Sequence, residues 1–474
     1  MKHIKITTYL LIVLTTNTVF GAVRLVPQEY SNIQAAIEAC DNLDTVVVAP
    51  GIYYGQGNRN INMRGKSITV RGTDPGNSAV VDATIIDCEG KGCGFIFYMG
   101  ENSSSMVAGL TITNGYAFLG GAIYCYNNSS PSITKCTFIK NSAIFGGAIA
   151  CTNSRSYPNI TNCDITENEA LIGGGAIYCN GASPKIANCV ISGNFAPDGG
   201  AIYSHNTGKP VIVNCTIGGN AASKSAGALY CFNSSNLNIE NSILWGDTAP
   251  YAKEILVGNG GAVTTIQISY CDIQNRNESV VSKSGCIIEW GQGNIADDPN
   301  FANTGYVRSI KTRVGGDYHL LKGSSCIDAG NPSFVAGADE TDIDGKPRIS
   351  GPRIDIGAYE FETPITAIVK VTPETLNLAS NGNWISCNIQ LPADHDICEI
   401  DTSSITVNKE IKPAWSEIDE ESQKLLIKFD RSEIQEMAKN SQGELSLTIS
   451  GNLNNGMAFE GTDTIRIIGK GSKK

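Results

Sequence analysis

The hexapeptide Gly120-Gly-Ala-Ile-Tyr-Cys125 decides the fold, because close copies of it return along the chain at a nearly constant interval. The copies are Gly146-Gly-Ala-Ile-Ala-Cys151, Gly174-Gly-Ala-Ile-Tyr-Cys179, Gly199-Gly-Ala-Ile-Tyr-Ser204 and Ala226-Gly-Ala-Leu-Tyr-Cys231. Successive copies lie 26, 28, 25 and 27 residues apart. A second motif keeps the same interval, as Ile133…Cys136…Asn141, Ile160…Cys163…Asn168, Ile186…Cys189…Asn194 and Ile212…Cys215…Asn220. This regularity indicates a solenoid of repeated units.

The content of each unit favours one kind of solenoid. A period in the mid-twenties is typical of leucine-rich repeats and of parallel β-helices. The L-x-x-L-x-L framework is missing, and no unit has room for a ten-residue amphipathic helix. Each unit instead holds strands of three to five residues separated by Gly, Asn, Ser and Pro. We therefore predict an all-β fold, a right-handed parallel β-helix of about eleven coils between Asp44 and Gly330.

Strand alternation assigns a direction to the repeated positions. If Cys125 points inward, Ile123 does too, and Tyr124 points outward. The predicted inward rows are Ile123, Ile149, Ile177, Ile202, Leu229, then Cys125, Cys151, Cys179, Ser204, Cys231, and finally Cys136, Cys163, Cys189, Cys215. Stacked cysteines about 4.8 Å apart with parallel Cβ vectors have poor disulfide geometry, so we expect buried thiols.

Two rows of asparagines accompany the cysteines. The first is Asn141, Asn168, Asn194 and Asn220, and the second is Asn162, Asn188, Asn214 and Asn241. We expect stacked side-chain amides at turns to hydrogen-bond to the next coil and to turn backbone, since buried polar groups need partners. Both rows are thus predicted to be structural ladders.

The N-terminal residues predict export and a cap on the first coil. Lys2, His3 and Lys5 precede an apolar run, and small residues suit cleavage after Gly21, so residues 1–21 are expected to be a signal peptide. The mature chain shows no further run long enough to span a membrane. We expect a secreted, extracellular or cell-surface location, with the periplasm as an alternative. Ser31 is expected to cap a helix from Ile33 to Cys40 that shields the open sheet edge.

Three stretches resemble known families and together cover about residues 30–361. Ile33-Gln-Ala-Ala-Ile…Asp44-Thr-Val-Val-Val-Ala-Pro-Gly-Ile-Tyr53 resembles the opening segment of pectin-lyase-like β-helix proteins. The G-G-A-I…N-C-x-I-x-x-N units resemble polymorphic outer-membrane-protein repeats, which implies a surface protein. Tyr318-His-Leu…Ser325-Cys-Ile-Asp-Ala-Gly-Asn-Pro332 with Asp342-Ile-Asp-Gly…Arg348…Asp355-Ile-Gly-Ala-Tyr-Glu360 resembles the module called choice-of-anchor Q. One such scaffold hosts lyases, hydrolases and adhesins, so the resemblance specifies architecture more than activity.

The composition changes after Phe361. The glycine repeat stops, and alternating runs such as Trp384-Ile-Ser-Cys-Asn-Ile389 read as strands. We expect a β-helix over 22–330, its choice-of-anchor Q-like end over 331–362, and a small C-terminal β-sandwich over 363–474. The role of the sandwich stays open between attachment and spacing.

Charge and cysteine content exclude several partners. The net charge of −11, from 35 basic and 46 acidic residues, argues against nucleic acid and against an anionic membrane surface. Among the 16 cysteines, Cys88 with Cys93 and Cys387 with Cys398 are candidate disulfides. No C-x-x-C or His-paired cysteine favours a metal or redox site, so no metal ligand and no cofactor is assigned.

Catalysis is the first function to weigh, and we leave it open while leaning against it. A polysaccharide lyase or glycoside hydrolase on this scaffold needs clustered carboxylates, with Arg or Lys as the base of a lyase. The position after the ladder cysteine reads Thr137, Asp164, Val190, Thr216 and Asp272, so its acids are not on neighbouring coils. No catalytic residue is assigned. A carboxylate cluster with Arg or Lys in one groove would favour an enzyme.

Binding is the second function, and the preferred one. Tyr124, Tyr178, Tyr203 and Tyr230 fall in one outward row, interrupted by Ala150, and a row of aromatic rings suits stacking of sugar rings. The alternative, kept open here, is that these tyrosines lie under a loop or simply cover the sheet. We predict a surface or matrix binding protein whose partner is polysaccharide or another cell-surface component.

The acidic loop Asp339-Glu-Thr-Asp-Ile-Asp-Gly345 is a candidate for Ca²⁺, because oxygen ligands alternate before a glycine. It lacks the bidentate Glu of an EF-type loop. The alternative is that these carboxylates pair with Arg348 and Arg353.

Overall fold

The computed structural model describes residues 21–469, apart from 310, 311, 315, 339, 442, 455 and 456. Of the expected signal peptide, all but Gly21 lies outside the described residues. The chain divides between Phe361 and Glu362 into two compact units, each described by itself below.

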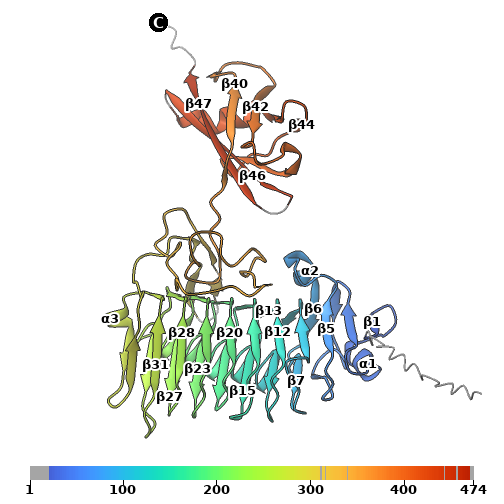
Figure 1. Cartoon of the computed structure of the whole chain (residues 1–474), viewed down its shortest axis with the longest axis vertical. Coiled ribbons are helices and arrows are strands. Elements are labelled where there is room, and N and C mark those ends of the chain that lie inside the picture. The colour runs from blue at the N-terminus through green and yellow to red at the C-terminus, as the bar shows by residue number, and fades with distance from the viewer. Residues whose placement is uncertain are drawn as a thin grey trace, which may run out of the picture. The chain divides into compact units, whose positions relative to one another are not determined.

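The N-terminal unit is a stack of coils whose strands pair in parallel with the same strands of the next coil (Figure 1). One coil contains β11 (Ile123–Cys125), β12 (Ser132–Thr134), β13 (Thr137–Ile139) and β14 (Ser142–Phe145). The next contains β15 (Ile149–Thr152), β16 (Asn159–Thr161), β17 (Asp164–Thr166) and β18 (Glu169–Gly173). The predicted parallel β-helix is confirmed.

Four parallel sheets run along this stack, and the longest has 11 described strands. The first sheet is β1 (Val23–Val26), β2 (Thr45–Val48), β5 (Thr69–Gly72), β8 (Met106–Ala108), β12, β16, β20 (Lys185–Ala187), β24 (Val211–Val213), β28 (Leu237–Glu240), β31 (Thr265–Ser269) and β34 (Ile287–Trp290). The second is β3 (Gly51–Tyr53), β6 (Thr84–Asp87), β9 (Thr111–Thr113), β13, β17, β21 (Val190–Ser192), β25 (Thr216–Gly218), β29 (Ile243–Trp245) and β32 (Asp272–Ile273). The third is β4 (Ile61–Asn62), β7 (Phe95–Phe97), β11, β15, β19 (Ile177–Asn180), β23 (Ile202–His205), β27 (Leu229–Phe232), β30 (Ile255–Gly258) and β33 (Val280–Ser282). The fourth is β10 (Tyr116–Leu119), β14, β18, β22 (Phe195–Asp198) and β26 (Ala221–Ser225).

The predicted inward rows form the core of the stack. Ile123 pairs with Ile149, and Ile149 with Ile177, in exact strand register. The ladder cysteines are buried as well, and the Sγ of Cys163 and of Cys189 each lies 3.2 Å from the carbonyl oxygen two residues earlier. All described cysteines are free thiols, so neither Cys88 with Cys93 nor Cys387 with Cys398 forms the disulfide considered from the sequence.

The first asparagine row is a continuous hydrogen-bonded ladder. Asn141 donates its backbone N–H and its Nδ2 to Oδ1 of Asn168, at 2.9 and 3.0 Å. The same pair of bonds joins Asn168 to Asn194 and Asn194 to Asn220. Asn220 donates in turn to Oδ1 of Asp247, which extends the ladder by one coil.

The prediction that the second asparagine row is also an amide ladder is wrong. Its members have left-handed backbones with φ near 50°, namely Asn162, Asn188, Asn214 and Asn241. Asparagine tolerates that conformation better than most residues, so the turn geometry explains the row. Neither side-chain amide atom of Asn214 has a hydrogen-bond partner.

Helix α1 (Ile33–Glu38) packs Ile33, Ala36 and Ile37 into the core at the start of the stack, as expected. Its cap is Asn32, whose side chain accepts from the N–H of Ala35, so the expected cap at Ser31 is wrong. A second helix, α2 (Ser78–Ala83), was not expected from the repeats, and α3 (Arg276–Ser279) follows β32.

The last part of this unit turns back along the stack. Short strands β35 (Phe301–Asn303) and β38 (Asp317–Leu320) pair with each other, as do β36 (Tyr306–Ser309) and β37 (Thr312–Val314). Residues 317–361, called the returning segment below, are mostly irregular. Figure 1 shows α2 and the loops of this region on the same side of the stack.

The C-terminal unit has two sheets around one apolar cluster that includes Ile385, Phe429 and Phe459. One sheet contains β39 (Ile365–Thr366), β41 (Thr375–Asn377), β43 (Ile400–Val407), β46 (Glu444–Leu453) and β47 (Ala458–Ile468). The other contains β40 (Ile368–Thr372), β42 (Trp384–Gln390), β44 (Trp415–Asp419) and β45 (Lys424–Asp430). The remaining elements are α4 (Arg431–Met437), η1 (Ile397–Glu399) and η2 (Ala438–Asn440). The alternating strands expected after residue 363 thus form additional C-terminal sheets.

Candidate functional site

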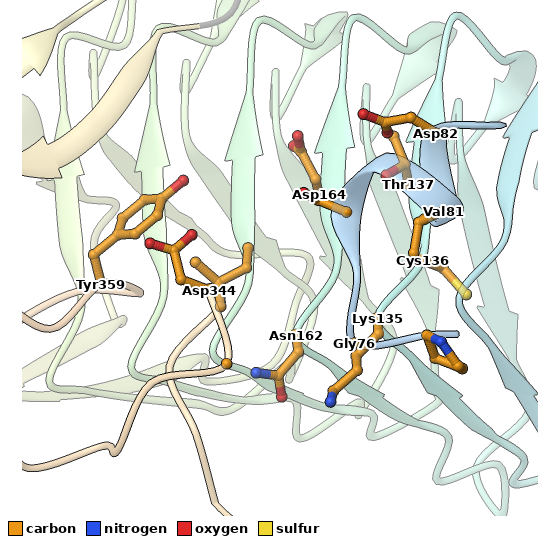
Figure 2. Close-up of a pocket in the computed structure, with 14 residues that line it drawn as sticks. Gly76, Val81, Asp82, Lys135, Cys136, Thr137, Asn162, Asp164, Asp344 and Tyr359 are labelled. Carbon is orange, nitrogen blue, oxygen red and sulfur yellow. The ribbon is translucent and has the colours of Figure 1, made fainter. Parts of the chain in front are cut away.

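A polar groove lies on the second sheet, where α2 and the returning segment face each other across β13 and β17 (Figure 2). Its volume is about 340 Å³, within the range of small-ligand sites. The side chains used below are Asp82 of α2, Lys135 and Asp164 of the coils, and Asp344 and Tyr359 of the returning segment.

Hydrogen bonds hold the returning segment against the coils and so shape one wall of the groove. Asn162 donates its Nδ2 to the carbonyl oxygen of Asp342 at 2.7 Å. The N–H of Ala358 donates to Oγ1 of Thr216 at 3.0 Å. Tyr318 is buried and donates its hydroxyl to the carbonyl oxygen of Gly218 at 2.8 Å. The wall is therefore anchored at two coils, once beside β17 and twice at β25.

A buried ion pair stiffens the same wall from within. Arg348 Nη1 lies 2.7 Å from Glu360 Oε2, and both side chains are almost completely excluded from solvent. Asp342 is also buried and accepts from the N–H groups of Lys346 and Glu360. This network holds the segment that carries Tyr359 and Asp344.

The opposite wall is α2. Asn77 caps it by accepting from the N–H of Ala79, and Val81 turns into the interior. The hydroxyl of Thr111 on β9 donates to the carbonyl oxygen of Val81 at 2.9 Å. These contacts fasten the helix to the sheet and leave Asp82 exposed above it.

Asp164 is the most perturbed carboxyl in the groove. Burial, and then the nearby charges of Asp82 and Glu167, raise the pKa of Asp164 to about 7. Its Oδ1 is buried and has no hydrogen-bond partner among the described residues. A carboxyl in this state holds a proton near neutral pH, which suits proton transfer or a hydrogen bond to a ligand.

Lys135 occupies the left-handed turn position that asparagines fill in later coils. Its φ is 52°, against 51° for Asn162 and 64° for Gly109 in the coils on either side. A lysine is a poor choice for that backbone, so its presence beside the groove is a local departure from the repeat pattern.

His319 links the aromatic and acidic parts of the returning segment. Its ring centroid lies 4.0 Å from that of Tyr359, and its Nε2 lies 2.8 Å from Asp344 Oδ2. Burial opposes protonation, but hydrogen bonds to Asp344 and Asp317 raise the pKa of His319. His319 was not assigned a role from the sequence.

The tyrosine row lies in strand register, but the structure contradicts the expectation that all four rings are substantially exposed. Tyr178 is only 6% exposed and stacks on Phe145, with ring centroids 4.7 Å apart. Tyr124, Tyr203 and Tyr230 are half-buried. The rings of Tyr203 and Tyr230 stack face to face at 5.0 Å, so each occupies a face of the other. Tyr178 is therefore covered, by Phe145 of β14 rather than by a loop, and the row is not an unbroken platform.

The described part of the acidic loop supports neither of the two interpretations made from the sequence, a Ca²⁺ site or pairing of its carboxylates with Arg348 and Arg353. Asp342 is satisfied by backbone N–H groups and Asp344 by His319, while Arg348 pairs with Glu360 and the side chain of Arg353 donates to the carbonyl oxygen of Asp328. Asp339 lies outside the described residues. Across the described part of the chain, no group of three or more His, Cys, Asp or Glu is placed to hold a metal ion.

Sequence reasoning missed Asp82 and Tyr359 as site residues, and considered Asp344 only within the candidate Ca²⁺ loop, because its search for catalytic acids was limited to those that align in the coil register. Asp164 does align with Thr137 and Val190, as expected, and its coil neighbours are not acidic. The other acids come from α2 and the returning segment, which are not repeats. The recurring motifs begin only at Gly120, so they gave no signal for α2, which lies between β5 and β6.

Family models match two parts of the coil stack. A model described as the right-handed β-helix region matches residues 45–191. The coil stack is a right-handed β-helix. A model for the Chlamydia polymorphic membrane protein repeat matches residues 188–205, so the expected repeats are present in the β-helix.

Among solved structures, the chain is similar to the crystal structure of pectate lyase Pel9A, at 16% identity. The match covers 69% of this chain and 90% of that chain, with a TM-score of 0.39. No curated protein matches the chain. Among the described helices, none combines the length and apolar character needed to cross a membrane.

Proposed function

We propose that the chain is an extracellular or cell-surface β-helix protein that binds polysaccharide, and that the groove rather than the tyrosine row is the binding site. The observation that carries the proposal is the polar groove itself, built by three separate chain segments beside Tyr359. The polymorphic-membrane-protein-like repeats support a surface location. The expected export signal agrees with it.

The groove offers the groups that sugars need. Carboxylates of Asp82 and Asp344 accept hydrogen bonds from hydroxyls, and Lys135 donates them. Tyr359, half-buried at the wall, supplies an aromatic surface for the apolar face of a sugar ring. The returning segment is anchored by buried contacts, so this arrangement is preformed and little ordering is required on binding.

Cleavage of the bound polysaccharide is the second candidate, and one observation favours it. Asp164, which holds a proton near neutral pH, shares the groove with the carboxyl group of Asp82 and with Lys135. A protonated acid beside a carboxylate is the donor and acceptor pair of a hydrolase, and a lysine is a candidate base for a lyase. This cluster is the feature that the sequence analysis named as favouring an enzyme.

The test is a glycan array probed with the purified chain, followed by affinity measurements and by reducing-end and unsaturated-product assays on each hit. Lys135→Asn is the sharpest variant, because asparagine already fills that turn in the coils of Asn162 and Asn188. The matched control is Lys140→Gly, a left-handed turn lysine outside the groove whose position is glycine at Gly193.

Loss of affinity in Lys135→Asn but not in Lys140→Gly supports binding in the groove. Equal affinity in wild type and Lys135→Asn, or no glycan bound at all, contradicts the proposal. Product formed by wild type and abolished in Asp164→Asn establishes cleavage.

A further inference from the structure

The groove is acidic. Three carboxyl groups line it, on Asp82, Asp164 and Asp344, against the single ammonium group of Lys135. They come from α2, from β17 and from the returning segment, so the excess of acid is built by three independent parts of the chain. The chain as a whole is acidic too, with a net charge of −11.

The neighbouring cations do not remove this excess. Arg348 is buried against Glu360, and Lys140 lies 3.8 Å from Glu167 outside the groove. His319 is shared between two carboxylates, Asp344 and Asp317, so even a protonated imidazole leaves that group of three with a net negative charge. The charges that act on Asp164 within the groove are those of other acids, chiefly Asp82. Burial, followed by the charges of Asp344 and Asp164, raises the pKa of Tyr359. The aromatic wall therefore also lies in a negative field.

We propose that the groove selects a glycan with protonated amino groups, a hexosamine polymer with free amines, over a polyuronate. This inference rests on the proposed binding function and adds the chemical class of the ligand. An ammonium group pairs with the carboxylates of Asp82 and Asp344, and it is attracted to the face of Tyr359. A uronate would instead bring a fourth carboxylate among three, which like-charge repulsion and desolvation both oppose.

Binding of such an amine is linked to a proton. In the empty groove, Asp164 is about half protonated near pH 7. A bound ammonium favours the ionised carboxylate, so on binding the proton of Asp164 passes either to a neutral amine of the ligand or to solvent. A neutral glycan has no charge that would produce this transfer.

The experiment is titration calorimetry of the full chain near pH 7, repeated in two buffers of different ionisation enthalpy. The probes are hexasaccharides of glucosamine, of N-acetylglucosamine and of galacturonate, the last with and without millimolar Ca²⁺. We expect the glucosamine hexamer to bind at least about tenfold more tightly than the other two, with a number of exchanged protons that differs between wild type and Asp164→Asn. Asp82→Asn and Asp164→Asn should each weaken that hexamer by about fivefold or more.

The control is Asp198→Asn, a carboxyl on β22 whose pKa burial also raises but that lies outside the groove. It should leave the affinity unchanged, and melting temperatures of all variants verify folding. Preferred binding of galacturonate, with or without Ca²⁺, overturns the ligand class while leaving polysaccharide binding intact. Equal affinity for oligolysine and the glucosamine hexamer also overturns it, because charge alone then explains binding. Failure of all three glycans to bind overturns the proposed function as well.

Discussion

Asn168 donates both its backbone N–H and its side-chain Nδ2 to one oxygen, Oδ1 of Asn194, at 2.9 and 3.0 Å. Asn194 makes the same two bonds to Asn220, and its Nδ2 also reaches the carbonyl oxygens of Ile165 and Ser192. The amide of Asn194 thus accepts from the preceding coil and donates to the coils on both sides. Both side chains are completely buried, so no water replaces a lost partner.

Replacing Asn194 by Leu should lower the free energy of unfolding by about 1–3 kcal/mol, because the N–H of Asn168 and two carbonyl groups lose their partners. Urea denaturation measures the change. Asn214→Gly is the control, since Asn214 is equally buried, has a left-handed backbone and makes no side-chain hydrogen bond. Equal losses in the two variants would contradict a specific role for the ladder.

Replacing Asp164 by Asn should change how stability depends on pH. The folded-state pKa of Asp164 is raised from 3.8 to about 7, so between these values the folded protein binds a proton that the unfolded chain has lost. Stability therefore falls as pH rises through this window, and the variant lacks that loss. The melting temperature of the variant minus that of wild type should increase from pH 4 to pH 7.5. A difference that stays constant over this range would rule out the raised pKa.

Cys163, Cys189 and Cys215 should resist alkylation in the folded protein and react fully after denaturation without reductant. All three are buried, and burial raises the pKa of Cys163 and Cys215, which keeps the unreactive thiol form. Cys398 is exposed and serves as an internal control that labels in the native state. Mass spectrometry of the labelled peptides reads out all four sites, and disulfides among the ladder cysteines would disprove the prediction.

Tyr178→Ala should destabilise the β-helix by about 2–4 kcal/mol, because the ring is buried against Phe145. Tyr124→Ala should cost clearly less, since its ring is half-exposed and its coil neighbour in the row is Ala150. Chemical denaturation of the two variants gives the comparison. Similar costs would show that both rings are covered to the same degree in solution.

The repeat allowed most of the coil architecture to be predicted from sequence. A period near 26 residues places each residue beside its equivalent in the next coil, so Ile123 beside Ile149 and Asn141 beside Asn168 follow from spacing alone. The same argument erred where a row had a local cause. Asn162 and Asn188 recur because each lies at a left-handed turn. A row of residues required by backbone conformation has the same spacing as a hydrogen-bonded ladder, so spacing alone does not tell the two apart.

The site was harder to predict because its members do not share that spacing. Asp82 and Asp344 are 262 residues apart in the sequence, and only folding of the returning segment brings both to the groove. Tyr178 illustrates the same limit. Strand alternation correctly predicted that its side chain points outward, but it did not reveal that Phe145 covers the ring. Contacts made by irregular segments depend on tertiary structure that a periodic pattern does not encode.

The returning segment also limits how many coils the β-helix can contain between its anchor points. It bonds to the stack at Asn162, Thr216 and Asp272, the last through Cys326, so its anchor points span four coil steps, or about 19 Å. Inserting one complete coil between these points would preserve every strand pair yet displace one anchor by about 4.8 Å. Repeat number is therefore free to vary before α2, but between α2 and Asp272 any gain or loss of a coil would open or distort the groove.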